Sequence, residues 1–273
     1  MDRTEFGVVV VLVLLSAAVG ALALVLLRKA AEEEPAFSVA LLWLLIRRRP
    51  VWAAGIAAMV VEFGLQLLAL AGGPISLVQL LVVMELPFCL VLSRLVLGGL
   101  LAAREWSAVA GMTVGVVVLL VTLAPHGGNP NTLDLITWLR GLAMTIAVVV
   151  TVLVAARRSG QAARTALAGI AAGTSAGLVA VLVKPVTATF GQGLGAVLAT
   201  WQTWAAIVVA AAAFLLLQHA LRAGRLVASQ PGITLANPLV AAAWGVLVFH
   251  EQVRTGWWLL GAASGAVLLV GGA

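Results

Sequence analysis

The chain has 273 residues, of which 63% are hydrophobic and 10% charged, with 16 Lys and Arg against 10 Asp and Glu. Soluble domains carry roughly 25% charged residues, so this composition excludes an ordinary soluble protein. The basic excess would suggest nucleic acid in a soluble chain, but here the basic residues stand at the ends of apolar runs, as topology signals do. We expect an integral membrane protein that has the lipid bilayer, and no nucleic acid, as a partner.

The first apolar run, Phe6 to Leu27, contains no charged residue. An apolar helix of about 20 residues spans the hydrocarbon core. The run is too long for the core of a signal peptide, and Asp2 and Glu5 do not suit a basic leader. We therefore expect it to be the first transmembrane helix.

Turn and charge signals divide the chain into nine apolar spans. They cover residues 6–28, 51–72, 75–98, 105–124, 133–156, 164–185, 202–222, 226–249 and 255–272. Two further apolar segments, 37–46 and 191–201, are too short to cross unaided, so we expect them to be interfacial or re-entrant. The predicted fold class is all-α: a polytopic membrane protein of nine helices, or ten if the short segments dip deeply.

The basic residues predict how the chain is oriented. One side of the membrane receives Arg28, Lys29, Arg47, Arg48, Arg49, Arg104, Arg157, Arg158, Arg164, Arg222 and Arg225. The other receives Arg3, Arg254 and Lys184, the last expected at the interface. Positive residues favour the cytoplasm, so in a plasma (inner) membrane the N-terminus lies outside and the C-terminus in the cytoplasm. An interfacial aromatic belt is predicted from Trp201, Trp204, Trp257 and Trp258.

The Gln, Gly, Pro and Trp residues that interrupt the apolar runs recur at matching positions in the two halves of the chain. At one constant spacing, Gln79, Pro87, Gly73 and Trp106 are repeated as Gln230, Pro238, Gly224 and Trp257; Gln66 and Trp52 match Gln218 and Trp204. The pattern predicts a first repeat (1–130), a connecting helix (131–160) and a second repeat (161–273). One intervening crossing makes the copies antiparallel, and inverted repeats are common in secondary transporters, which bind substrate between the halves. Gly169, Gly173 and Gly177 predict close helix packing.

Two carboxylates lie well inside predicted spans. Glu62 shares a helix face with Gln66, four residues later. Glu85 stands two residues before Pro87, which removes a backbone donor and favours a kink. An ionisable group at this depth usually faces a cavity or a partner, so either carboxylate could bind a proton, cation or amine. The alternative is pairing with Arg94 or snorkelling to an interface.

The second half offers neutral polar groups in place of charge. Gln230, Thr234 and Asn237 fall on one helix face beside Pro238, and interhelical hydrogen bonding would also explain them. The candidate substrate or ion pathway therefore comprises Glu62, Gln66, Gln79, Glu85, Pro87, Gln218, Gln230, Thr234, Asn237 and Pro238.

Motifs of soluble enzymes are absent from the sequence. There is no GxxxxGK[ST] phosphate loop, no GxGxxG after a strand and no HExxH. The single cysteine, Cys89, lies in an apolar run and rules out a Cys-based metal site. We expect no enzyme activity, no cofactor and no assigned metal site.

Two stretches carry a resemblance to a known family. SQPGITLANPLVAAAWGVLVFHEQVRTGWWLLGAASG, Ser229 to Gly265, resembles the last two helices of the EamA-like group in the drug/metabolite transporter superfamily, including an aliphatic run that ends in Glu251. RRRPVWAAGIAAMVVEFGLQLLALAGGPISLVQ, Arg47 to Gln79, resembles the first half of its actinobacterial members. Nine helices and the Ala124-Pro125 pair are also similar to the neighbouring NIPA-like magnesium transporters. Leu100 stands where the second copy has Glu251, a departure from the pattern.

The resemblance implies a carrier of small metabolites or drug-like solutes that works by alternating access. Two alternatives stay open at this point: a NIPA-like divalent-cation transporter and a non-transporting membrane scaffold or accessory subunit. The expected partner is a small molecule or ion, and a homodimer is left open.

Overall fold

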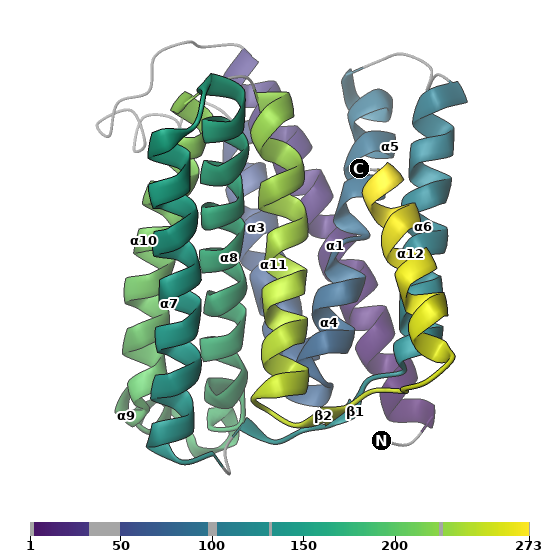
Figure 1. The fold of residues 1–273 in the computed structure, drawn as a ribbon. Coiled ribbons are helices and arrows are strands. Elements are labelled where there is room, and N and C mark those ends of the chain that lie inside the picture. Colours follow the sequence, from purple (N-terminus) through teal and green to yellow (C-terminus); the bar gives the residue numbers. More distant parts are fainter. Residues whose placement is uncertain (1–2, 33–49, 98–102, 131–132, 224–225, 273) are drawn as a thin grey trace.

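Long helices running side by side make up most of this computed structural model (Figure 1). The structure describes residues 3–32, 50–97, 103–130, 133–223 and 226–272. In chain order the helices are α1 (Arg3–Glu32), α3 (Pro50–Gly72), α4 (Ile75–Val82), α5 (Glu85–Leu97), α6 (Ala103–Leu123), α7 (Leu135–Arg158), α8 (Gln161–Thr187), the 3-10 helix η2 (Phe190–Gln192), α9 (Leu194–Ala199), α10 (Trp201–Ala223), α11 (Leu226–Leu247) and α12 (Trp258–Gly272). When α4 and α5 are counted as one interrupted span, each of the nine predicted spans coincides with a described helix.

Two short strands, which no pattern in the sequence indicated, join distant loops. β1 (His126–Gly127) follows α6, and β2 (Glu251–Gln252) follows α11. They pair antiparallel, with His126 opposite Gln252 and Gly127 opposite Glu251. We call the end of the molecule that holds these strands and the α3–α4 turn the strand end.

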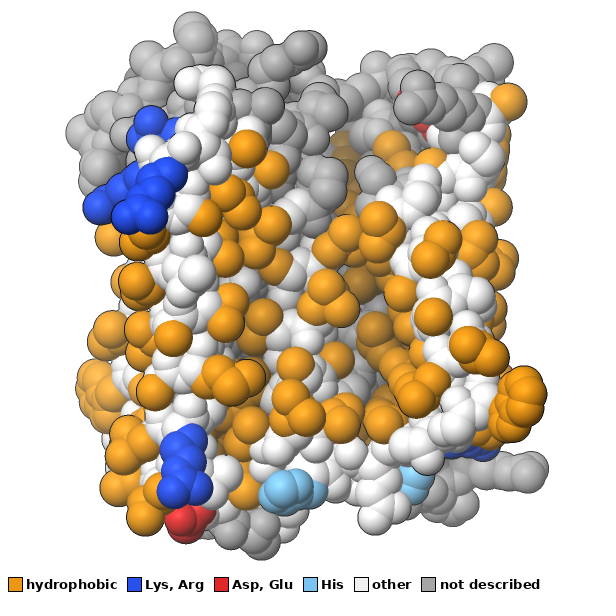
Figure 2. Space-filling model, in the orientation of Figure 1, with side chains coloured by type: hydrophobic (Ala, Val, Ile, Leu, Met, Phe, Trp, Pro, Cys, Tyr) orange, Lys and Arg blue, Asp and Glu red, His pale blue; other side chains and the backbone are white. Residues whose placement is uncertain are grey.

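The helices are long and apolar enough for a multi-span membrane protein. Among the described residues, six stretches meet the length and hydropathy of a membrane span: Thr4–Leu26, Ala53–Gly72, Ile75–Ser93, Glu105–Leu123, Leu135–Arg158 and Ala163–Thr187. Three shorter apolar helical stretches follow, Trp201–Leu217, Leu235–Leu247 and Trp258–Gly271. Hydrophobic side chains cover the middle of the face in Figure 2, and the basic side chains visible there lie toward the two ends. The prediction of an all-α, multi-pass membrane protein is confirmed at this level.

The two short segments have different outcomes. Residues 191–201 form the end of η2, the helix α9 and the start of α10. The six residues of α9 rise only about 9 Å, at 1.5 Å per residue, so α9 does not cross. Segment 37–46 lies outside the described residues.

Small residues allow several helices to approach closely. A Cβ on Gly173 of α8 would collide with the carbonyl oxygen of Ile233 on α11, and one on Gly177 would lie 2.6 Å from the carbonyl oxygen of Asn237. The packing role expected for these two glycines is thus confirmed. Gly115 of α6 meets the backbone of α12 in the same way. Without water to drive apolar burial, such backbone contact is a main source of helix association in lipid.

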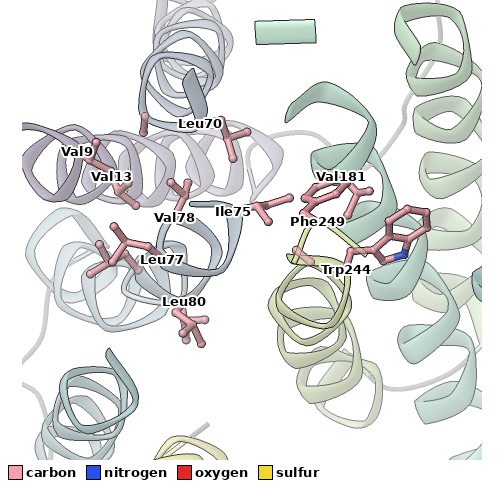
Figure 3. Close-up of a cluster of buried hydrophobic side chains, with 14 of the residues drawn as sticks. Val9, Val13, Leu70, Ile75, Leu77, Val78, Leu80, Val181, Trp244 and Phe249 are labelled. Atoms are coloured by element: carbon pink, nitrogen blue, oxygen red, sulfur yellow. The ribbon is translucent and has the colours of Figure 1, made fainter. Parts of the chain in front are cut away.

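The hydrophobic core at the strand end joins the two halves of the chain. Ile75, the first residue of α4, is fully buried, and Figure 3 shows it directed toward Val181 of α8 and Phe249 after α11. Trp138 packs edge-on against Trp201, with ring centroids 5.5 Å apart.

Basic residues occur at both ends of the described bundle. Arg157, Arg158 and Arg164 flank the α7–α8 turn, opposite the strand end. Lys184 and Arg254 are at the strand end, as is Arg140, which the sequence had not assigned to either side of the membrane. Trp201, Trp204, Trp257 and Trp258 are 40 to 87% exposed at helix beginnings on the strand end. Which end faces the cytoplasm stays a prediction.

Candidate functional site

The third span is broken in its middle. α4 ends at Val82, and α5 begins at Glu85. Pro87 has no N–H to offer the carbonyl of Val83, and its ring would crowd that carbonyl in a continuous helix. The chain tightens there instead: Met84 N donates to Leu81 O at 2.9 Å, and Leu86 N donates to Val83 O at 3.1 Å. The kink predicted from Pro87 is therefore a full interruption.

The two predicted carboxylates lie near this break. Glu85 occupies the first turn of α5, where the partial positive charge of a helix N-terminus favours an anion. Glu62 on α3 packs against α1, since a Cβ on Gly20 would lie 2.7 Å from Glu62 Cδ. The Ser16 hydroxyl donates to the Glu62 backbone carbonyl at 3.1 Å.

Glu62 and Glu85 are close enough to interact electrostatically. Both are partly buried, and among the described side chains neither has a basic partner. The side chain of Arg94, the alternative partner, lies outside the described residues. The structure thus places two partly buried carboxyl groups in the region of the interrupted helix.

Three other candidate residues share one cavity. Gln66 of α3, Gln79 of α4 and Asn237 of α11 line a space of about 100 Å³, with α8 on the remaining side. Gln79 is 1% exposed. Among the described residues, neither polar atom of its amide has a hydrogen-bond partner, and the same holds for Oδ1 of Asn237. Because buried polar groups are almost always hydrogen-bonded, these three atoms are candidates for contact with a ligand.

The remaining candidates are outside this cavity or outside the described part of the chain. Pro238 is buried within α11, which continues through it without a break. The second half therefore lacks the interruption that Pro87 causes in the first. The side chains of Gln218, Gln230 and Thr234 lie outside the described residues.

Two charged residues at the strand end were not among the candidates. Glu251 is 4% exposed, and its Oε1 and Oε2 accept the backbone N–H groups of Ile75 at 2.6 Å and Ser76 at 3.1 Å. Burial raises the pKa of Glu251, while those hydrogen bonds and the charge of Lys184 oppose the rise. The sequence offered one signal for this residue: the aliphatic run that ends in Glu251.

Lys184 lies near the end of α8, at the strand end, and its interfacial placement stays a prediction. It is partly buried, and its Nζ donates to the carbonyl of Leu70, in the last turn of α3, and at 2.6 Å to the carbonyl of Gly73, the residue after α3. Ile75 and Ser76 begin α4. The α3–α4 turn is thus held at both helix ends by residues of the second half.

Comparisons with known proteins identify a relative without a known role. No family model matches the sequence, and no solved structure matches it. An uncharacterized protein of Corynebacterium glutamicum is 31% identical over 224 residues, which cover 81% of this chain and 76% of that protein.

Proposed function

The chain belongs to one family with that corynebacterial protein, and we propose that it is a secondary transporter of a small polar metabolite or drug-like solute. The observation that carries the proposal is Gln79, a buried amide in the cavity between the two halves whose polar atoms have no hydrogen-bond partner among the described residues. Leaving such a group unsatisfied costs about 1–3 kcal/mol. A transporter explains why the group is kept, because a passing ligand supplies the missing hydrogen bonds.

The position of the cavity supports alternating access. Gln66 and Gln79 come from the predicted first repeat, and Asn237 comes from the second. Corresponding helices of the two repeats pack alike: α1 lies against α3, and α8 lies against α10. Inverted repeats of this kind place their substrate at the interface and rock one half against the other.

The broken third span supports a role for charge. Discontinuous helices line the sites of many secondary transporters, with helix ends available to ions and substrates. Glu62 and Glu85 at such a break would supply the coupling or cation-binding charge, while the amides orient the ligand. The resemblance to the drug/metabolite transporter superfamily supports the same mechanism.

Transport by the purified protein in liposomes tests the proposal. Pooled metabolites and divalent ions are screened with and without a proton gradient. We expect flux of at least one solute, and loss of that flux in Gln79→Leu, because the leucine fills the space without hydrogen-bonding. Thr113→Val is the matched control, since the Thr113 hydroxyl bonds only within its own helix, to Val109 O at 2.8 Å. Absence of flux in every pool, or full flux in Gln79→Leu, contradicts the proposal.

The proximity of Glu62 and Glu85 favours a second candidate, a divalent-cation transporter. Magnesium keeps several waters and is usually held by one or two carboxylates. Loss of magnesium flux in Glu62→Gln or Glu85→Gln, with competition by other divalent ions, would select this candidate. Normal metabolite transport by both variants would instead remove charge coupling from the mechanism. A non-transporting scaffold is less well supported, because its buried polar groups should all be paired, unlike Gln79.

A further inference from the structure

Two side chains from the second half of the chain form hydrogen bonds with the α3–α4 turn. Lys184 of α8 donates to the carbonyls of Leu70, in the last turn of α3, and of Gly73, the residue after it, and Glu251 of β2 accepts the first N–H groups of α4. We call Lys184, Glu251 and the turn Gly72–Pro74 the clasp.

The clasp matches the polarity of the helix ends that it holds. The free carbonyls at a helix C-terminus carry partial negative charge, and the free N–H groups at an N-terminus carry partial positive charge. Lys184 contacts carbonyls at the C-terminal end of α3, and Glu251 contacts N–H groups at the N-terminal end of α4. α4 has no side-chain cap of its own, since its N-cap residue is Pro74. Glu251 therefore does the work of a cap from a position 176 residues away.

The surroundings of Glu251 are shaped closely around its carboxylate. A Cβ on Gly245 would lie 2.5 Å from Glu251 Oε2, and one on Gly128 would collide with Glu251 Cγ. The Ser76 hydroxyl points to the Ala242 carbonyl at 3.5 Å, which adds a further contact between α4 and α11. The two glycines therefore leave room for the buried Glu251 carboxylate at the place where the two halves of the chain meet.

Two cavities adjoin the hydrogen bond between Lys184 and the Leu70 carbonyl. On one side, Leu70 and Val183 line the cavity of Gln79. On the other, Gly73, Pro74 and Lys184 line a larger space of about 530 Å³ at the strand end, together with Glu5 and His126. Lys184 and the Leu70 carbonyl that it binds thus lie between the two spaces. A solute passing from one to the other would have to part these groups.

We propose that the clasp is the gate at the strand end, closed in this structure and opened when α4 separates from Lys184 and Glu251. The inference rests on the proposed transport function. Its partners are helix ends of fixed polarity, so the clasp differs from an ordinary ion pair between two side chains. Removing either charge frees the turn and exposes the Gln79 cavity to the strand end.

Thiol labelling tests the gate without any substrate. The chain's one cysteine is removed as Cys89→Ala, and Leu67→Cys places a thiol in the Gln79 cavity. A membrane-impermeant maleimide is applied to intact cells and to inside-out vesicles, which identifies the strand-end side. We expect slow labelling from that side with the clasp intact. Lys184→Met or Glu251→Ala should accelerate it about tenfold, which corresponds to a shift of ~1.4 kcal/mol in the closed–open equilibrium.

Two controls keep this result interpretable. Asp134→Asn removes a carboxylate that caps α7 at the same end through Thr137 N, 3.2 Å away, and should leave labelling slow. Trp257→Cys, at a position 87% exposed, should label at one rate in every variant that folds. Unchanged labelling of Leu67→Cys in the folded Lys184→Met and Glu251→Ala proteins overturns the gate.

A charge swap separates the clasp from a simple ion pair. In Lys184→Glu with Glu251→Lys, each charge faces a helix end of like sign, so labelling should stay fast. Return to slow labelling would mean that the two side chains pair with each other, which contradicts the clasp. Since labelling needs no flux, a failed transport screen refutes the proposed function while the labelling still decides whether the turn opens.

Discussion

Single polar residues carry most of the functional information in this membrane protein. Gln79 is the clearest case, because its amide is buried and, among the described residues, has no hydrogen-bond partner. Such a residue weakens the fold, so its presence calls for a reason outside stability. Functional sites commonly contain residues that lower the stability of the fold, because activity requires them there.

Gln79→Leu is therefore expected to stabilise the protein while it abolishes flux. Leucine has a similar shape and leaves no polar atom without a partner, so the gain should be of the order of 1–3 kcal/mol. Thermal unfolding in detergent measures it, as a rise in Tm against the wild-type protein. Thr113→Val should leave Tm nearly unchanged. A lower Tm for Gln79→Leu would show that the amide has a structural partner.

Among the elements of the second half, the helices α8 and α11 pack closely against each other. Gly173 and Gly177 of α8 face backbone carbonyls of α11 at contact distance. Asn237, which lines the Gln79 cavity, lies in this contact zone. The close approach therefore helps to position a candidate ligand-binding residue as well as to hold the helices together.

Gly173→Ala should destabilise the protein, since its methyl group collides with the Ile233 carbonyl and backbone cannot yield as a flexible side chain can. Overpacking of this kind costs about 1–3 kcal/mol. Gly64→Ala is the matched control: a Cβ at that position of α3 meets nothing within 4 Å, and alanine is the better helix former. Unfolding in detergent should separate the two variants, and equal stability would contradict this account of the α8–α11 contact.

At the scale of the whole molecule, the described bundle has two unlike ends. The strand end holds the pair of strands β1 and β2 and the hydrogen bonds of Lys184 and Glu251 to the α3–α4 turn. The opposite end displays Arg157 and Arg158 at the end of α7 and Arg164 at the start of α8. With positive residues favouring the cytoplasm, the clasp would face the outside of the cell.

Reporter fusions test this orientation. A fluorescent protein that folds only in the cytoplasm should be active at the C-terminus, and an export-dependent phosphatase should be inactive there. A cysteine in the α7–α8 turn, such as Ser159→Cys, should be shielded from impermeant reagent in intact cells, whereas Trp257→Cys should react. The reverse pattern would invert the topology and place the clasp on the cytoplasmic side.

The sequence by itself determined the class of protein and the positions of its helices. Spans could be predicted because the bilayer demands long apolar helices whose hydrogen bonds are internal. The interruption near Pro87 could be predicted as a kink, since a proline acts on the carbonyl four residues before it. Gln66, Gln79 and Asn237 could be named as polar residues at membrane depth, though their meeting in one cavity could not.

Only the tertiary structure decided which polar groups meet. Glu251 and Ile75 are 176 residues apart, and no local periodicity reports a contact of that range. The sequence placed Lys184 near a helix end, but its hydrogen bonds to the carbonyls of Leu70 and Gly73 depend on where the α3–α4 turn lies in space. Helix ends become binding partners through their placement in space, because the backbone groups that they expose are the same in every sequence.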